Sequence, residues 1–327
     1  MFPIHRILVA VKDTRSRHLG ALHKAVQLAR ALDAEVCLFH AIADPLYVDV
    51  PLDGESLPQI ERENRETYRE RLERLAQRVR RSGVEITTAA EWDFPTHEAV
   101  VRAAVHFEAD LIVAECHAKG HVAPWLLHFT DWELLRNSPI PVLLVKSTRP
   151  YRRPKILAAI DPGHAFDKPA DLDGEILRYG ATVAGALHGA LHAVHAYNPM
   201  LTGMSATELI RPEAIAAAQA ATEENARAAV ARVVKPVGLS ARRQHIEGGY
   251  AIDVLQRVAE QLHAGILVMG AVSRSGLKRL FIGNMAERIL DRATCDILIV
   301  KPRTFRNQIS RTRRGVRYVT APVMAGI

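Results

Sequence analysis

The side chains best suited to chemistry lie in the second half of the chain, in a stretch of glycine and small polar residues between Met269 and Glu287. Gly270 ends an apolar run with the composition of a buried strand, and a residue without a side chain lets a ligand approach the backbone closely. Gly283 and Asn284 stand where a helix is expected to begin. Since the first turn of a helix presents free N–H groups and the positive end of its dipole, this stretch predicts a site for an anion such as phosphate.

The frame that positions these residues is an internal repeat. A shift of 155 residues places residues 39–41 on 194–196 and residues 142–146 on 297–301. The first apolar segment of each copy aligns with a shift of 149 instead. The second copy therefore holds about six extra residues just after that segment, and the chain is two versions of one structural unit in tandem.

Each copy alternates short apolar segments with longer helical patterns. The segments are rich in Val, Ile, Leu and Ala without polar alternation, which is typical of strands buried on both faces of a parallel sheet. We therefore predict an α/β protein of two tandem doubly wound, Rossmann-like domains, each a five-stranded parallel sheet core flanked by helices. The strands are expected near 6–11, 35–42, 84–90, 110–114 and 141–146, and near 155–160, 190–197, 240–247, 265–270 and 296–301.

The repeat sets the expected domains at residues 1–148 and 149–302, followed by a tail at 303–327. The tail contains six arginines and no acidic residue, and without it the basic and acidic side chains nearly balance. A polar, basic segment outside both repeats is typical of disorder. We expect a disordered tail, with an electrostatic arm for an anionic partner as the alternative.

The rest of the composition favours a cytoplasmic protein. No apolar run approaches the roughly 18 residues that a membrane span needs, and the start of the chain lacks the features of a secretion signal. Cys37, Cys116 and Cys295 lie in or beside apolar runs without a metal-binding spacing, so we interpret them as small apolar residues in a reducing compartment. No metal site and no membrane contact are predicted.

Sheet topology indicates where a ligand would bind. In an open, doubly wound sheet, ligands bind beyond the carboxyl ends of the strands, where the strand order reverses. The residues that end the first and fourth strands of the second copy are Asp161 and Gly270. No nucleophile and base accompany them at a recognisable spacing, so binding is favoured over hydrolysis.

The spacing at this point resembles the universal stress protein family, whose ATP-binding members carry Gly, two residues, Gly, nine residues, Gly and then Ser or Thr. Gly270, Ser273, Gly283 and Asn284 occupy these four positions, so two of the four are substituted. The tandem layout, with Thr130-Asp131-Trp132 in the first half, is most similar to the family's tandem, UspE-like subfamily. The resemblance extends over residues 4–302.

The resemblance implies a stress-response regulator that binds ATP, with or without Mg²⁺, in its second domain and acts through protein partners that the sequence does not identify. It also implies that the two domains pair through their fifth strands. The alternative is a ligand-free interaction scaffold with both pockets vestigial, and a slow ATPase is a further one. By position in the family, Asp161 would contact adenosine, His195 and Ala196 the base, Met269 and Gly270 the ribose, and Ser273, Arg274, Gly283, Asn284 and Met285 the phosphates.

The first copy differs at every aligned position of this site, so we predict that it cannot bind ATP. The small or acidic residues of the second copy have become bulky or opposite in charge. Because the first and fourth strands are neighbours in such a sheet, we hypothesise an ion pair between Lys12 and Glu115 across the vacant pocket. The alternative is that both side chains point separately into solvent. The replacements are Lys12 for Asp161, Glu115 for Gly270, and His128-Phe129 for Gly283-Asn284.

Overall fold

A computed structural model describes residues 4–16, 19–48, 57–115, 124–164, 171–198, 211–270, 288–289 and 292–320. The chain divides into two compact units. The first unit comprises Ile4–Ile140 together with Asn307–Ile327, and the second comprises Pro141–Arg306 together with Met1–Pro3. Both are α/β units built around parallel strands, as the sequence predicts.

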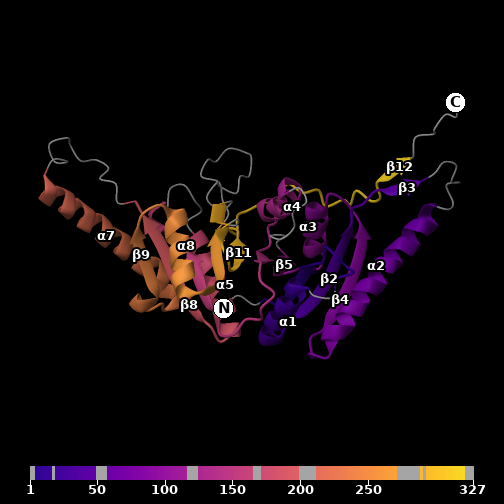
Figure 1. The fold of residues 1–327 in the computed structure, drawn as a ribbon, viewed down its shortest axis with the longest axis horizontal. Coiled ribbons are helices and arrows are strands. Elements are labelled where there is room, and N and C mark those ends of the chain that lie inside the picture. Colours follow the sequence, from indigo (N-terminus) through magenta and orange to yellow (C-terminus); the bar gives the residue numbers. More distant parts are fainter. Residues whose placement is uncertain are drawn as a thin grey trace. The chain divides into compact units, whose positions relative to one another are not determined.

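In the first unit, four parallel strands stand in the order β4-β2-β1-β5. The chain moves outward from β1 to β2 and β4, and then returns to the other side of β1 with β5. The strand order therefore reverses beside β1, as expected for a doubly wound sheet. The elements are β1 (Arg6–Ala10), α1 (Gly20–Leu32), β2 (Glu35–Ile42), β3 (Leu46–Val48), α2 (Leu57–Arg80), β4 (Ile86–Trp92), α3 (Thr96–His106), β5 (Leu111–Glu115) and α4 (Pro124–Asn137) (Figure 1).

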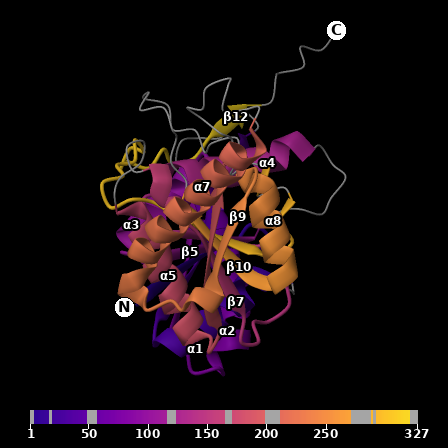
Figure 2. The ribbon, with the colours of Figure 1, turned by 90° about the vertical axis from the view of Figure 1, so that its left-hand side faces the viewer.

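The second unit repeats this plan with five parallel strands in the order β11-β10-β7-β8-β9. Helices α5 and α7 lie on one side of these strands and α8 on the other (Figure 2). The order reverses beside β7, at the position equivalent to β1. The elements are β6 (Val142–Val145), β7 (Lys155–Ala159), α5 (Leu172–Ala186), β8 (Ala190–Tyr197), α7 (Pro212–Val234), β9 (Gln244–Gly248), α8 (Ala251–Leu262), β10 (Ala264–Gly270) and β11 (Asp296–Val300).

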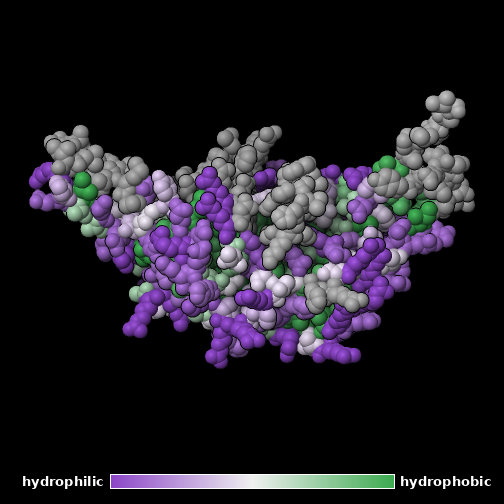
Figure 3. Space-filling view, viewed as in Figure 1, coloured by the Kyte–Doolittle hydropathy of each residue, from purple (hydrophilic) through white to green (hydrophobic). Residues whose placement is uncertain are grey.

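The residue types explain why these elements form. The central strands β1, β5 and β11 and the middle of β10 are buried and mostly apolar, because helices cover both faces of a parallel sheet. Helix α5 packs closely on its sheet because Gly180 has no side chain, and a Cβ there would meet Leu191 at 2.8 Å. Helix α2 buries only Leu72, Leu75 and Ala76. Most of the other residues of α2 are charged or polar, and purple predominates over this helix in Figure 3.

The fifth strand of the first copy, β6, lies in the second unit. It runs antiparallel to β11, with Leu143 opposite Leu298. The fully buried carboxylate of Asp296 accepts hydrogen bonds from the backbone N–H groups of Lys146 at 2.9 Å and Ser147 at 3.2 Å, and from the Tyr151 hydroxyl. These bonds fix the connection after β6 to the start of β11. Burial and this carboxylate raise the pKa of Tyr151, so the hydroxyl remains the donor.

The basic tail differs from the expected disordered segment over the part that the structure describes. Residues 318–320 form β12 (Tyr318–Thr320), which pairs in parallel with β3 (Figure 1). Arg313 and Arg314 make ion pairs with Glu91 at 2.7 Å and Glu98 at 2.9 Å. The expectation was wrong there because composition reveals only that the tail is basic, whereas order depends on carboxylates that distant segments place opposite its arginines.

Two further sequence predictions bear on the core and on membranes. Cys37 and Cys295 are buried, and burial raises the pKa of each thiol to about 11, so both stay protonated. Cys116 lies outside the described residues. Among the helices that the structure describes, none combines the length and the apolar character needed to cross a bilayer.

Candidate functional site

The candidate site of the second unit lies where three neighbouring strands end. Strand β7 stands between β10 and β8, and all three are parallel, so their carboxyl ends meet at one edge. This places Asp161 after β7, His195 and Ala196 near the end of β8, and Gly270 at the end of β10. The structure therefore brings together the described residues that were expected to hold the adenosine end of a nucleotide.

His195 is held in a fixed orientation at this edge. Its ring is 5% exposed, and Nδ1 lies 3.2 Å from the carbonyl oxygen of Ile160. Because a carbonyl only accepts, Nδ1 carries the proton and donates this bond. The same nitrogen lies 3.9 Å from a carboxylate oxygen of Asp161. The buried histidine thereby fixes the carbonyl that precedes Asp161.

Asp161 is also held through its backbone, by the first turn of α5. Its N–H donates to the carboxylate of Asp173 at 3.1 Å. Asp173 is 5% exposed, whereas the Asp161 side chain is 36% exposed. The buried acid fixes the backbone, and the partly exposed carboxylate of Asp161 lies at the strand end. Sequence reasoning missed Asp173, although an acidic residue in the first turn of an expected helix was the available signal.

Gly270 packs closely against the start of α5. A Cβ on this residue would lie 2.7 Å from Cδ2 of Leu172, the first residue of α5. Met269, just before it, is 5% exposed, so a ligand at this edge would meet its backbone rather than its side chain. The absence of a side chain at Gly270 thus serves helix packing as well as the approach of a ligand.

The expected phosphate-binding residues lie outside the described residues. They are Ser273, Arg274, Gly283, Asn284 and Met285. Within the described ranges, no group of three or more His, Cys, Asp or Glu side chains is placed to hold a metal ion.

The equivalent edge of the first unit contains an ion pair. The Lys12 ammonium lies beside Glu115, as predicted, but its contact there is with the backbone oxygen, at 3.2 Å. The carboxylate that it pairs with is Asp131 of α4. The Glu115 carboxylate instead accepts a hydrogen bond from the backbone N–H of Ala21, at the start of α1, at 3.2 Å. The predicted partner was wrong because strand order fixed only which strand ends are neighbours and gave no position for α4.

The strand edges of both units contain a histidine that is held in the same way. In the first unit, Nδ1 of His40 lies 2.7 Å from the carbonyl oxygen of Val11, which is the same contact that His195 makes with Ile160. The His40 ring also stacks on Tyr68 of α2, with ring centroids 4.7 Å apart. Burial lowers the pKa of His40, so the ring is neutral and suited to this contact. The histidine alignment found in the sequence thus corresponds to one conserved local geometry.

Comparison with known proteins agrees with this geometry. The universal stress protein family model matches residues 3–146 and again residues 153–301. Universal stress protein E of Escherichia coli (strain K12) is 26% identical over 308 residues, which cover 94% of this chain and 97% of that protein. A functionally unknown protein from Pseudomonas aeruginosa PAO1 has a solved structure with a TM-score of 0.67, 27% identity, and coverage of 92% of this chain and 93% of that one. The solved structure of a putative universal stress protein from Pseudomonas aeruginosa UCBPP-PA14 has a TM-score of 0.66 and 26% identity. It covers 92% of this chain and 94% of that one.

Proposed function

Because the chain belongs to the universal stress protein family and is a tandem, UspE-like member, we propose that its second domain binds ATP. The adenosine would lie at the ends of β7, β8 and β10, against Asp161 and the backbone of His195, Ala196 and Met269. The phosphates, with or without Mg²⁺, would extend toward Ser273, Arg274 and the helix that Gly283, Asn284 and Met285 are expected to begin. The protein would act in the cytoplasm as a stress-response regulator.

The observation that carries this proposal is the contrast between the two strand edges. In the second unit, Asp161 is partly exposed and the neighbouring position is Gly270, which has no side chain. In the first unit, the same two positions hold Lys12 and Glu115, and Lys12 is paired with Asp131. Only the second edge combines a partly exposed carboxylate with a bare backbone, which suits the hydroxyls of a ribose.

We propose binding rather than turnover as the activity, with slow ATP hydrolysis at most. Asp161 is the only carboxylate among the five expected site residues that the structure describes, and its neighbour His195 is buried with Nδ1 committed to a carbonyl. A histidine with this contact orients a backbone segment, and at 5% exposure its ring has little access to water. Regulation would then depend on which proteins recognise the ATP-bound second domain.

We further propose that the two domains pair through their fifth strands. The antiparallel register of β6 with β11 supports this, because these are the fifth strands of the two copies. In this arrangement, the first domain serves as an interaction scaffold. Its strand edge, which Lys12 and Asp131 occupy, favours that role over ligand binding.

The decisive experiment is to identify nucleotide that copurifies with the chain. The purified protein is heat-denatured, and the supernatant is separated by ion-exchange chromatography against adenine nucleotide standards. We expect close to one ATP per chain, and much less from the Asp161→Lys variant. If the wild-type protein carries none and titration calorimetry with added ATP gives no heat, the ATP proposal is wrong and the ligand-free scaffold is the better description.

A further inference from the structure

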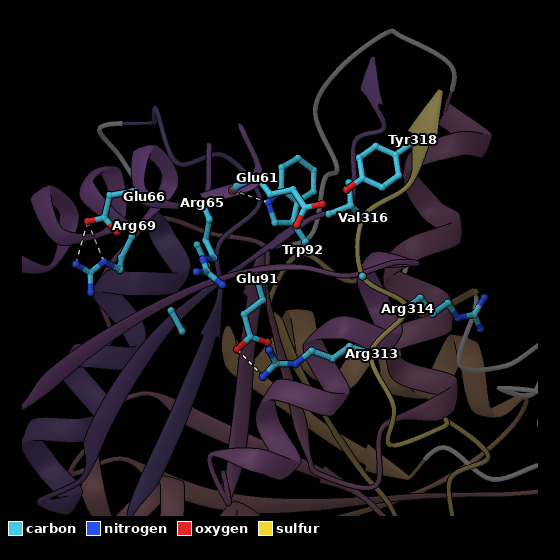
Figure 4. A pocket seen from close by; sticks show the side chains of 13 residues that line it. Glu61, Arg65, Glu66, Arg69, Glu91, Trp92, Arg313, Arg314, Val316 and Tyr318 are labelled. Atoms are coloured by element: carbon cyan, nitrogen blue, oxygen red, sulfur yellow. Dashed lines mark hydrogen bonds and ion pairs between the residues drawn. The ribbon is translucent and has the colours of Figure 1, made fainter. Parts of the chain in front are cut away.

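The described part of the C-terminal segment lies against an acidic surface of the first unit that is remote in sequence. This surface, called the acidic groove below, consists of Glu91 at the end of β4, Asp93 and Phe94 after it, and Glu98 in the first turn of α3. Arg313 pairs with Glu91 at 2.7 Å, and both oxygens of Glu98 lie 2.9 Å from the guanidinium of Arg314. Figure 4 shows Arg313 reaching from the segment toward Glu91.

The groove also forms hydrogen bonds with the backbone of the segment. The Asp93 carboxylate accepts a hydrogen bond from the N–H of Arg314 at 3.0 Å. Asp93 is 1% exposed and is held by two hydrogen bonds from Arg102, at 2.7 and 2.8 Å. Arg102 in turn donates to the carbonyl oxygen of Ser310 at 3.2 Å. A buried acid–guanidinium pair thus presents one acceptor and one donor to the incoming backbone, which is a preformed arrangement for an extended peptide.

The segment also contacts an aromatic ring and the edge of strand β3. The guanidinium groups of Arg314 and Arg317 lie 5.8 and 5.7 Å from the centre of the Phe94 ring, within the range of a cation–π contact. The carbonyl oxygen of Arg317 accepts from the N–H of Leu46 at 2.8 Å, and β12 then continues alongside β3. Addition of an extended segment to an unpaired strand edge is a recurrent mode of peptide binding.

These contacts are suited to release. The side chains of Arg313 and Arg314 remain 51% and 49% exposed, and ion pairs at such positions contribute about 0.2–1 kcal/mol each. Beside the segment, a pocket of about 790 Å³ remains open between it and α2, lined among others by Arg65, Trp92 and Tyr318 (Figure 4). The segment is therefore held by specific polar contacts along one side rather than by burial in a core.

From this geometry we propose that the acidic groove is a docking site for an extended, arginine-rich segment and that the tail of a second copy of this chain can occupy it in trans. The chain's own tail is the occupant in the structure, and an identical segment from another copy would make identical contacts. Tethering gives the chain's own tail an effective concentration on the order of millimolar, so exchange is suppressed in dilute solution and increases with protein concentration.

The test uses two full-length variants with complementary charge reversals. In the groove variant, Glu91→Lys and Glu98→Lys make the groove basic, while Asp93 is left intact. In the tail variant, Arg313→Glu and Arg314→Glu make the tail acidic. Each variant alone repels its own tail, whereas in the mixture each tail meets a groove of opposite charge. We expect a 1:1 complex by multi-angle light scattering in the mixture at low salt, weakened at high salt, and absent from either variant alone.

A second measurement keeps the proposal testable if the groove variant does not fold. The tail variant has an intact groove and a tail that cannot dock, so a fluorescein-labelled peptide of residues 307–320 should bind it saturably. Binding to the wild-type chain should be at least tenfold weaker because its groove is occupied. A peptide carrying Arg313→Glu and Arg314→Glu is the matched control. If the mixed variants give no complex although both are folded by circular dichroism, or if the peptide binds both chains equally, the proposal is overturned.

Discussion

The two copies of the repeat place the same histidine in the same geometry and yet differ at the strand ends beside it. His40 and His195 each donate from Nδ1 to the carbonyl at the end of the neighbouring first strand. The next residues are then Lys12, which is paired with Asp131, and Asp161, which is partly exposed. The backbone geometry around this histidine is thus retained in both copies. The residues at the strand ends differ, with Lys12 and Glu115 in the first copy where the second has Asp161 and Gly270. We propose that this difference makes the second copy an ATP-binding domain and the first an interaction domain.

The largest expected effect comes from giving the second copy the residue of the first. Asp161→Lys replaces the proposed adenosine-contacting carboxylate with a longer, oppositely charged side chain. We expect the affinity for ATP to fall at least 100-fold, about 2.7 kcal/mol, in titration calorimetry. Glu224→Lys, which makes the same charge change on the exposed face of α7, should bind as the wild type does. Equal affinity in the wild type and Asp161→Lys would contradict the proposed site.

A second test breaks the ion pair of the first copy. Lys12→Met removes the ammonium and leaves the carboxylate of Asp131, which is 10% exposed, without that partner. We expect a loss of about 1–3 kcal/mol from the stability of the first unit, because an unpaired buried carboxylate pays its desolvation cost. The measurement is the midpoint of urea unfolding followed at the first unit.

The matched control for this test is the double variant Lys12→Met with Asp131→Leu, which removes both charges. It should recover much of the lost stability, because no charge is left buried. Neither variant should bind a second ATP per chain in addition to the one proposed for the second domain, since Glu115 still stands where the second copy has Gly270. Saturable micromolar binding by the first domain would overturn the comparison between the copies.

The third prediction concerns acid and a stacked histidine pair in the second copy. His192 on β8 and His245 on β9 stack with ring centroids 5.3 Å apart, and nitrogens of the two rings are 3.1 Å apart. Burial, together with the positive charges of His245, Arg243 and Lys155, lowers the pKa of His192 to about 4. Burial also lowers the pKa of His245. The aligned residues of the first copy, Cys37 and Ala90, do not titrate in this range.

The sign of the pH effect follows from these lowered pKa values. Between the ordinary histidine pKa of about 6.5 and a pKa of about 4, the unfolded chain binds a proton that the folded second unit does not. Stability is therefore full above about pH 6.5 and declines as the pH falls toward 4, by about 1 kcal/mol once partial exposure is discounted. His192→Thr should flatten this decline in thermal melts of the second unit. An unchanged pH profile in that variant would exclude the histidine pair as its cause.

The smallest expected effect concerns the aromatic support of the shared histidine. Tyr68→Leu removes the ring that stacks on His40, which should cost about 0.5–1 kcal/mol of stability in the first unit. Tyr250, which is 83% exposed, provides the control substitution Tyr250→Leu with no expected loss. If both variants melt alike, the stack contributes nothing that would distinguish the two histidines.

The sequence by itself determined the repeat, the strand and helix order, and the strand ends that form the candidate site. These follow from local pattern, because buried parallel strands must be apolar and chain reversal beside the first strand fixes which ends are neighbours. The alignment of His40 with His195 was visible for the same reason. The predicted strands near 35–42 and 190–197 coincide with β2 and β8.

Only the tertiary structure decided which side chains meet across long stretches of chain. It gave Lys12 the carboxylate of Asp131 rather than that of Glu115. It also ordered a tail that composition alone marked as disordered, by setting Glu91 and Glu98 opposite its arginines. Such ion pairs depend on how elements that are distant in the sequence are arranged in space. The sequence shows which side chains are charged, but it does not show which oppositely charged side chain will lie beside each of them.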